Sequence, residues 1–253
     1  MTPYVDLGGV RNWYDDRGSG DPLVFMHGAI VDSRFYERNI EALAEHFQVF
    51  SHDRRGHGRT PDVEGPMTFE AMVEDNIALL EEVVGAPAHL VGHSNGAFAA
   101  LLTALRRPDL VRRLVMISGG FHRDGLVSEE PAENPDAPLP DFAAAHGEVS
   151  PDGAGHFQVL MEKTAALDSR EPALPQSSLG EIEARTLLMF GDDDLVTIEH
   201  IGATYEGIPH AELAVVPGTS HFLLQEKPAL CNRIIVDFLT SDPVPTMAPI
   251  RRS

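Results

Sequence analysis

The sequence lacks several features that would place a protein outside the ordinary soluble class. Its 253 residues include one cysteine, Cys231, which excludes an internal disulfide and is expected to be a packed thiol. No stretch approaches the roughly 18 consecutive apolar residues of a membrane-spanning helix. The first residues, 1–6, lack the basic and apolar regions of a signal peptide. We therefore expect a soluble, cytoplasmic protein.

Basic residues are also scarce. The 19 Lys and Arg residues face 39 Asp and Glu residues, for a formal net charge of −20. Such a charge opposes the phosphate neutralisation that drives nucleic-acid binding, and it repels anionic membrane surfaces. No His-Glu-x-x-His motif and no paired-cysteine spacing suggests a metal site. We expect a small-molecule substrate, with no nucleic acid, membrane, metal or cofactor as partner.

What the sequence does contain is a regular alternation of short apolar runs and helix-like segments. Two short runs at the start, Tyr4–Leu7 and Arg11–Asp15, predict an antiparallel hairpin at a sheet edge. Alternation of the later strands with helices predicts βαβ units and hence a parallel arrangement. The later predicted strands are Leu23–Met26, Gln48–His52, Ala88–Val91, Arg113–Ser118, Arg185–Phe190 and Ala211–Val216. The fold class is α/β, with a mostly parallel sheet of about eight strands flanked by helices.

The alternation is interrupted once. Residues 121–180 hold seven of the 19 prolines and no clear strand, with helix-like patches at Asp141–His146 and His156–Leu167. Such a long irregular segment favours an inserted lid over a connecting loop. We predict a core in two parts, residues 1–120 and 181–240, around a lid at 121–180. A poorly ordered tail, residues 241–253, follows.

The lid has a pronounced acidic bias. It carries eleven acidic residues against three basic ones, for a net charge of −8. A strongly anionic substrate is therefore expected to be disfavoured at its mouth.

The most informative motif is Gly92-His93-Ser94-Asn95-Gly96, between a predicted strand and a predicted helix. A sharp strand-to-helix turn forces an unfavourable positive φ on its central residue, and glycines on either side let the two arms approach. The spacing predicts a nucleophile elbow that exposes the Ser94 hydroxyl. The adjacent helix N-terminus and the Asn95 N–H could then stabilise a negatively charged oxygen.

A serine nucleophile needs a base, and that base needs a third group to orient it. Ligands of parallel sheets bind at the carboxyl ends of the strands. His221 alone follows the last strand into a loop at that edge, whereas His200 lies in a helix and His210 precedes the strand. Three candidate acids, Asp192, Asp193 and Asp194, follow the preceding strand.

These motifs together resemble the α/β-hydrolase superfamily, in its esterase, lactonase and cofactor-free haloperoxidase-like branches. The resemblance covers nearly all of residues 4–239. Five features carry it, in the family's order: His27-Gly28, Asp53-x-Arg55-Gly56-His57-Gly58, the elbow, Gly191-x-x-Asp194 and Gly218-x-x-His221. The chain order serine, acid, histidine is that of the family's catalytic triad.

The resemblance implies roles for five residues. Ser94 is the nucleophile, His221 the base and Asp194 the orienting acid, with Asp192 or Asp193 as alternatives. The backbone N–H groups of Ala29 and Asn95 form the oxyanion hole.

Arg55 and His57 are expected to hold their loop in place by hydrogen bonds and to have no part in the chemistry. Its Gly56-His57-Gly58 run lacks the third glycine of a dinucleotide fingerprint, so NAD is not expected.

Serine at position 94, rather than aspartate, argues against haloalkane dehalogenase or epoxide hydrolase chemistry. Three functions are consistent with the five implied site residues. The first is a hydrolase of a carboxylic ester or lactone that acts on a small, mostly neutral substrate. The alternatives are a hydrolase of carbon–carbon bonds in diketones and a ligand sensor that keeps the triad but turns over little.

Overall fold

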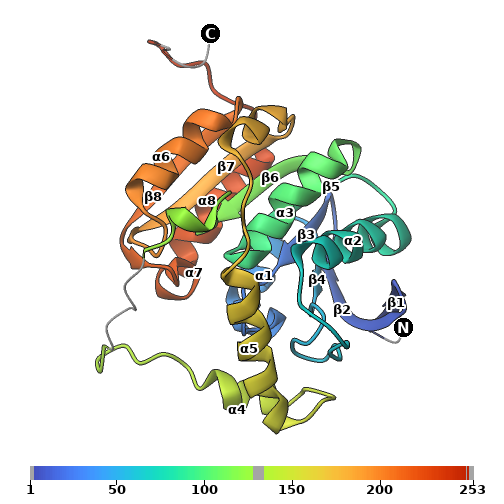
Figure 1. The fold of residues 1–253 in the computed structure, drawn as a ribbon. Coiled ribbons are helices and arrows are strands. Elements are labelled where there is room, and N and C mark those ends of the chain that lie inside the picture. Colours follow the sequence, from blue (N-terminus) through green and yellow to red (C-terminus); the bar gives the residue numbers. More distant parts are fainter. Residues whose placement is uncertain (1–2, 128–133, 249, 251–253) are drawn as a thin grey trace.

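One eight-stranded sheet organises the chain. A computed structural model describes residues 3–127, 134–248 and 250, and the strands lie in the order β1-β2-β4-β3-β5-β6-β7-β8 (Figure 1). The two pairs that involve β2 are antiparallel, and all the others are parallel. The strands are β1 (Tyr4–Leu7), β2 (Val10–Gly18), β3 (Pro22–Met26), β4 (Gln48–His52), β5 (Ala88–His93), β6 (Val111–Ile117), β7 (Arg185–Asp193) and β8 (Ala211–Ser220). The predicted hairpin and the mostly parallel sheet are confirmed.

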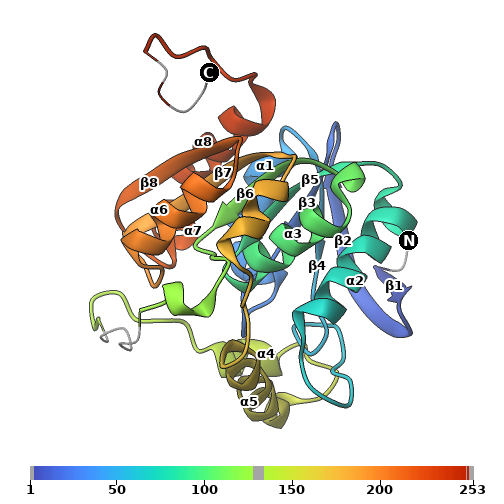
Figure 2. The ribbon, with the colours of Figure 1, turned by 45° about the horizontal axis from the view of Figure 1, so that its top comes forward.

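Helices cover both faces of the sheet (Figures 1 and 2). The α-helices are α1 (Glu37–Ala44), α2 (Phe69–Leu79), α3 (Asn95–Arg106), α4 (Phe142–Gly147), α5 (Phe157–Asp168), α6 (Ile198–Gly207), α7 (Leu223–Glu226) and α8 (Pro228–Thr240). Short 3₁₀ or π turns are η1 (Ser33–Tyr36), η2 (Leu80–Val84), η3 (Pro108–Leu110), η4 (Arg123–Gly125), η5 (Ala154–His156) and η6 (Gln176–Glu181).

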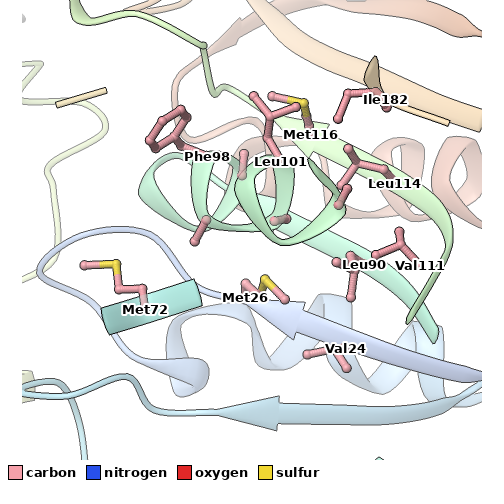
Figure 3. Close-up of a cluster of buried hydrophobic side chains, with 14 of the residues drawn as sticks. Val24, Met26, Met72, Leu90, Phe98, Leu101, Val111, Leu114, Met116 and Ile182 are labelled. Carbon is pink, nitrogen blue, oxygen red and sulfur yellow. The ribbon is translucent and has the colours of Figure 1, made fainter. Parts of the chain in front are cut away.

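Alternate side chains of each central strand enter two different cores. Val24 and Met26 of β3 pack with α2, α3 and α6, and Figure 3 shows this core around Phe98 and Leu101 of α3. Leu23 and Phe25 pack on the opposite face with α1 and α8. Burial on both faces explains why these strands are continuously apolar rather than alternating.

Cys231 lies in the second core, on α8, and is fully buried. Burial raises the pKa of its thiol to about 11, which makes it unreactive at neutral pH. The predicted packed thiol is confirmed.

Two helix starts can be compared with the sequence. Apolar spacing over residues 32–45 predicts one helix capped by Asp32 or Ser33, and Thr68 is predicted to cap the next helix. The Asp32 carboxylate accepts a hydrogen bond from the Arg34 N–H, but the segment opens as the 3₁₀ turn η1 before α1 begins. The segment from residue 32 to 45 therefore forms two elements rather than one helix. Thr68 caps α2 through the Ala71 N–H, and the helix ends with the π turn η2 at Gly85, whose φ is 69°.

Residues 118–184 connect β6 to β7 and are here called the β6–β7 segment. Figures 1 and 2 show α4 and α5 of this segment set apart from the two helical layers, beyond one edge of the sheet. Both helices lie where the sequence patches predicted them. Part of the predicted lid, residues 128–133, lies outside the described residues.

The predicted tail begins after α8. Residues 241–248 form no helix or strand. Residues 249 and 251–253 lie outside the described part of the chain.

Five deeply buried histidines make the fold sensitive to acid. His27, His52, His57, His89 and His93 are 1–3% exposed. Burial, assisted by nearby positive charge, lowers the pKa to about 4 for His52 and His89, to about 3 for His57 and His93, and well below its ordinary value for His27. These rings stay neutral in the folded protein at pH values where the unfolded chain protonates them.

We therefore expect the free energy of unfolding to be greatest above about pH 6.5, the pKa of an unfolded histidine, and to fall below it. Each ring contributes at most about 1.4 kcal/mol per pH unit, so the five together give up to about 7 kcal/mol per unit. Urea titrations at pH 7.5, 6.0 and 5.0 measure this slope. Most carboxylates stay ionised down to about pH 5, so their protonation does not offset the loss of stability that the histidines cause.

A matched pair of variants tests the origin of the acid sensitivity. His52→Gln removes one buried ring and should reduce the change in the free energy of unfolding per pH unit by up to about 1.4 kcal/mol, the contribution of one proton. His46→Gln, at an exposed ring, should leave it unchanged. A free energy of unfolding that is flat from pH 7.5 to 5.0 contradicts the prediction.

Candidate active site

A cavity of about 510 Å³ lies at the carboxyl ends of the central strands. Its floor includes the loops after β3, β5, β6 and β8, and the β6–β7 segment supplies the facing wall through Phe142 of α4 and Met161 of α5. Most of its lining is apolar. Ser94, Asn95, Ala29 and His221 all lie on it, so the fold brings these candidates together from the segments that follow three different strands, β3, β5 and β8.

Ser94 occupies the turn between β5 and α3 with φ 56° and ψ −124°. A Cβ atom on Gly92 would lie 2.3 Å from the Gly96 carbonyl oxygen, and one on Gly96 would lie 2.3 Å from the Met26 carbonyl oxygen. Neither site can hold a larger residue without moving backbone. The two glycines of the motif are therefore required by contact between strand, turn and helix, as the elbow geometry predicts.

Backbone strain concentrates at this cavity. Among the described residues, three non-glycine residues have a positive φ, namely Ile30 at 55°, Ser94 at 56° and Ser118 at 49°. All three line the cavity. Such conformations cost on the order of 1–3 kcal/mol each and persist only where the surroundings enforce them, which is common at functional sites.

Asp194 and His221 form a hydrogen-bonded pair. Asp194 Oδ1 lies 3.0 Å from His221 Nδ1, and the carboxylate is 1% exposed. Its Oδ2 accepts hydrogen bonds from the Ser118 hydroxyl and from the Gly191 N–H. Burial acts to raise the pKa of Asp194, but these donors and the His221 ring outweigh it and leave the pKa below its ordinary value. The carboxylate is therefore ionised at neutral pH.

The two neighbouring acids lie elsewhere. Asp192 and Asp193 are exposed. The Asp192 carboxylate accepts a hydrogen bond from the Thr219 N–H, 3.1 Å away. Of the three candidates that the sequence left open, Asp194 is the one in contact with His221.

The Ser94 hydroxyl and the His221 ring share the cavity wall. Within the described residues no hydrogen bond joins them, and His221 Nδ1 is engaged by Asp194. Since Nδ1 donates to a carboxylate, the neutral ring keeps its basic lone pair on Nε2. Catalytic hydrogen bonds to a serine are often long in unliganded sites and tighten when substrate binds.

A hydrogen-bond chain that the sequence did not predict ties three of these loops together. The Gly28 N–H donates to the Tyr36 hydroxyl at 3.2 Å, and that hydroxyl lies 2.7 Å from His93 Nδ1. His93 Nε2 lies 2.8 Å from the His221 carbonyl oxygen. Burial and the nearby His221 ring lower the pKa of His93 to about 3, so the ring is neutral. A carbonyl only accepts, so Nε2 carries the proton and Nδ1 accepts from Tyr36.

The loop after β3 is held by a second set of contacts. His27 Nδ1 donates to the Gly28 carbonyl oxygen at 2.7 Å, and Arg54 Nη2 donates to the same oxygen. In a trans peptide the carbonyl of one residue and the N–H of the next point in opposite directions. Fixing the Gly28 oxygen therefore fixes the direction of the Ala29 N–H.

Arg54 is itself unusual, because its guanidinium is buried and no ion pair to it occurs among the described residues. Burial lowers its pKa to about 10, which still leaves it charged at neutral pH. The neighbouring Arg55 pairs instead with Asp75, with both nitrogen–oxygen distances 2.6 Å, and His57 Nδ1 bonds to the Arg55 carbonyl oxygen. The predicted structural role of Arg55 and His57 is confirmed.

The other competing histidines have structural surroundings. His200 lies on α6, stacks on Phe121 and accepts a hydrogen bond from the Phe121 N–H. His210 precedes β8, at the opposite end of that strand from His221. Neither lines the cavity.

The chain belongs to the α/β-hydrolase family, whose model matches residues 23–234. It is similar to a protein of Azorhizobium caulinodans named provisionally as the carbamate hydrolase RutD, with 28% identity covering 93% of this chain and 97% of that one. A Mycobacterium tuberculosis protein named provisionally as the non-heme bromoperoxidase BpoC is 28% identical, covering 90% and 97%.

Among solved structures, the chain is similar to Est816, described as an N-acyl homoserine lactone degrading enzyme. The TM-score is 0.73 with 25% identity, covering 93% of this chain and all of that one. The predicted α/β-hydrolase fold is confirmed, and the chain is a hydrolase by family.

The described residues contain neither a candidate membrane-spanning helix nor a candidate metal site. None of their helices has the length and apolar character needed to cross a membrane. In the same residues, no cluster of three or more His, Cys, Asp or Glu side chains is arranged to hold a metal ion.

Proposed function

We propose that this protein is a serine hydrolase that cleaves a carboxylic ester or lactone of a small, mostly neutral substrate. The observation that carries the proposal is the Asp194–His221 pair, which opens into the same cavity as the strained Ser94 turn. A buried, ionised acid that orients an imidazole, together with a serine on the same cavity, is the arrangement that nucleophilic acyl transfer requires.

The proposed reaction has two halves. Ser94 Oγ attacks the acyl carbonyl while His221 Nε2 takes its proton, and the proton then passes to the leaving alcohol as the carbon–oxygen bond breaks. Water attacks the acyl-enzyme by the same route, with its proton passing through His221 to Ser94. Asp194 keeps the ring in its tautomer and stabilises the imidazolium.

The oxyanion hole is proposed to consist of the Ala29 and Asn95 N–H groups. Asn95 is the first residue of α3, so its N–H has no partner within that helix. Ala29 belongs to the loop that Arg54 and His27 hold in place. A Cβ atom on the preceding Gly28 would lie 3.3 Å from Ser94 Cβ, which shows how closely the loop approaches the nucleophile.

The β6–β7 segment is proposed to act as the lid. Arg34, on η1, bonds to the Ala145 carbonyl oxygen and to Glu148 of this segment, and Lys163 of α5 pairs with Asp62. These contacts fasten α4 and α5 to the core. A cavity of about 510 Å³ with a mostly apolar lining fits a small, uncharged acyl group.

The relatives support acyl chemistry. Their names include a carbamate and an acyl lactone, both of which present a carbonyl bonded to a heteroatom leaving group. Serine at position 94 supplies the nucleophile for such carbonyls.

Covalent labelling tests the proposal directly. A fluorophosphonate should modify Ser94, located by peptide mapping, and abolish hydrolysis of p-nitrophenyl acetate and butyrate in proportion to labelling. Labelling at another serine, or ester hydrolysis that persists in fully labelled protein, contradicts the proposal.

Tyr36→Phe is expected to lower kcat for these esters about tenfold with little change in KM. The variant removes the hydroxyl between Gly28 N–H and His93 Nδ1, so it loosens the loops without touching substrate. Two buried groups lose a partner, which should also lower the free energy of unfolding by about 1–3 kcal/mol. Tyr14→Phe, on β2 and away from the cavity, is the control. An unchanged kcat in Tyr36→Phe excludes a positioning role.

A further inference from the structure

Asp168 is the single acidic residue on the described cavity lining, which contains no Lys or Arg. Of the eleven acidic residues in the predicted lid, Asp168 is thus the one that lines the described cavity. Asp168 is the last residue of α5, where the helix dipole is negative and disfavours a carboxylate. Its position is therefore unfavourable for the stability of the helix.

The carboxylate is also poorly paired. Among the described residues it accepts one hydrogen bond, from Asn95 Nδ2 at 3.4 Å, and it forms no ion pair. Burial raises the pKa of Asp168, against weaker opposing effects of the Asn95 amide and the Arg54 charge. A carboxylate has room for about four hydrogen bonds. Most of its accepting capacity is therefore unused by the described residues.

Thr164 lies one helical turn before Asp168 and also lines the cavity. Its side chain is 7% exposed, and its hydroxyl has no hydrogen-bond partner among the described residues. Threonines within helices commonly donate to the carbonyl four residues earlier. Three other helical threonines of this chain do so, at 2.7 Å each: Thr103, Thr204 and Thr240.

Residues four apart lie on the same helix face. The side of α5 that lines the cavity therefore carries one buried hydroxyl without a partner among the described residues and one underused carboxylate. A secondary amide offers the complementary pair, a carbonyl oxygen that accepts from a hydroxyl and an N–H that donates to a carboxylate. Leaving a buried polar group without a partner is costly, so a ligand that satisfies both groups is strongly favoured over one that satisfies neither.

We propose that Thr164 and Asp168 form a subsite for a secondary amide of the substrate, with the N–H bound by Asp168 and the carbonyl by Thr164. The substrate class is then an ester or lactone that carries an acylamino group close to the scissile carbonyl. Proximity follows from Asn95, which bonds to Asp168 through its side chain and directly follows Ser94. This inference rests on the proposed function and narrows its substrate.

Two isosteric esters test the subsite. Ethyl N-acetylglycinate and ethyl levulinate differ by the exchange of the amide N–H for CH₂, so both keep the carbonyl but one lacks the donor. In the wild-type protein, kcat/KM divided by the alkaline hydrolysis rate should favour the N-acetylglycinate about 10- to 100-fold, as expected for a hydrogen bond to a charged group.

Three variants assign the contacts. Asp168→Asn should reduce that preference at least about tenfold. Thr164→Val should lower kcat/KM for both esters alike, because both present the carbonyl. Glu162→Gln, at an exposed acid of α5 outside the cavity, should leave the preference as it is. Melting temperatures identify any variant that is poorly folded.

The outcomes separate this inference from the proposed function. If Ser94 takes the phosphonate and p-nitrophenyl butyrate is cleaved, but the preference is absent or survives Asp168→Asn, the subsite is wrong and the hydrolase remains. An equal loss on both esters in Asp168→Asn shows a structural role and also overturns the subsite. If Ser94 is not labelled and no ester is cleaved, both proposals fail.

Discussion

Ser94→Ala is expected to lower kcat for ester hydrolysis about 10⁴- to 10⁶-fold, the range seen when a serine hydrolase loses its nucleophile. The oxyanion hole and the cavity remain, so a small residual rate and a nearly unchanged substrate affinity are expected. Burst and steady-state kinetics with p-nitrophenyl butyrate measure both. The burst of the first turnover should disappear, because no acyl-enzyme forms.

The melting temperature of Ser94→Ala checks that any loss of activity does not come from unfolding. Alanine at position 94 keeps the positive φ of 56°, so the elbow strain remains and the melting temperature should change little. Ser169→Ala, at an exposed serine of the β6–β7 segment that does not line the cavity, is the control for both measurements. Equal slow hydrolysis by the wild type and Ser94→Ala would mean that the observed rate is background.

Asp194→Asn is expected to lower kcat about 10⁴-fold while leaving the geometry of the cavity intact. An asparagine amide can donate to His221 Nδ1, which places the ring proton on Nε2 and removes the base. The imidazolium that forms in the transition state also loses its negative partner. A pH profile of kcat/KM should show the loss at all pH values between 6 and 9.

The neighbouring aspartates provide matched controls. Asp193→Asn changes the same chemical group one residue away at an exposed position and should leave kcat unchanged. Asp192→Asn loosens the Thr219 N–H contact at 3.1 Å, so a modest fall in stability is expected. If Asp193→Asn is the variant that loses activity, the pairing of Asp194 with His221 is not the working arrangement.

The layout of the sheet was predictable because its determinants are local. Continuous apolar runs, the Thr68 cap and the Gly92 and Gly96 pair each act within a few residues. The order of motifs along the chain then sufficed to name the family. The position of Ser94 in a strained turn follows from the same short stretch.

The supporting contacts were not predictable, because each joins residues far apart in the sequence. Tyr36 meets His93 across 57 positions, and Ser118 meets Asp194 across 76. Asp168 is one of eleven acids in the predicted lid, and its sequence neighbours do not distinguish it. The helical spacing of Thr164 and Asp168 was visible, but that the two groups face the cavity depends on how α5 packs.

The strained backbone at Ile30 has a consequence for engineering this protein. A β-branched side chain at φ 55° is unfavourable, so Ile30→Gly should raise the melting temperature if the loop keeps its course. Glycine would also widen the range of loop conformations beside Ala29 in the unliganded protein. Selection for heat tolerance alone would therefore tend to relax this position at the expense of turnover, whereas selection for turnover would retain the isoleucine.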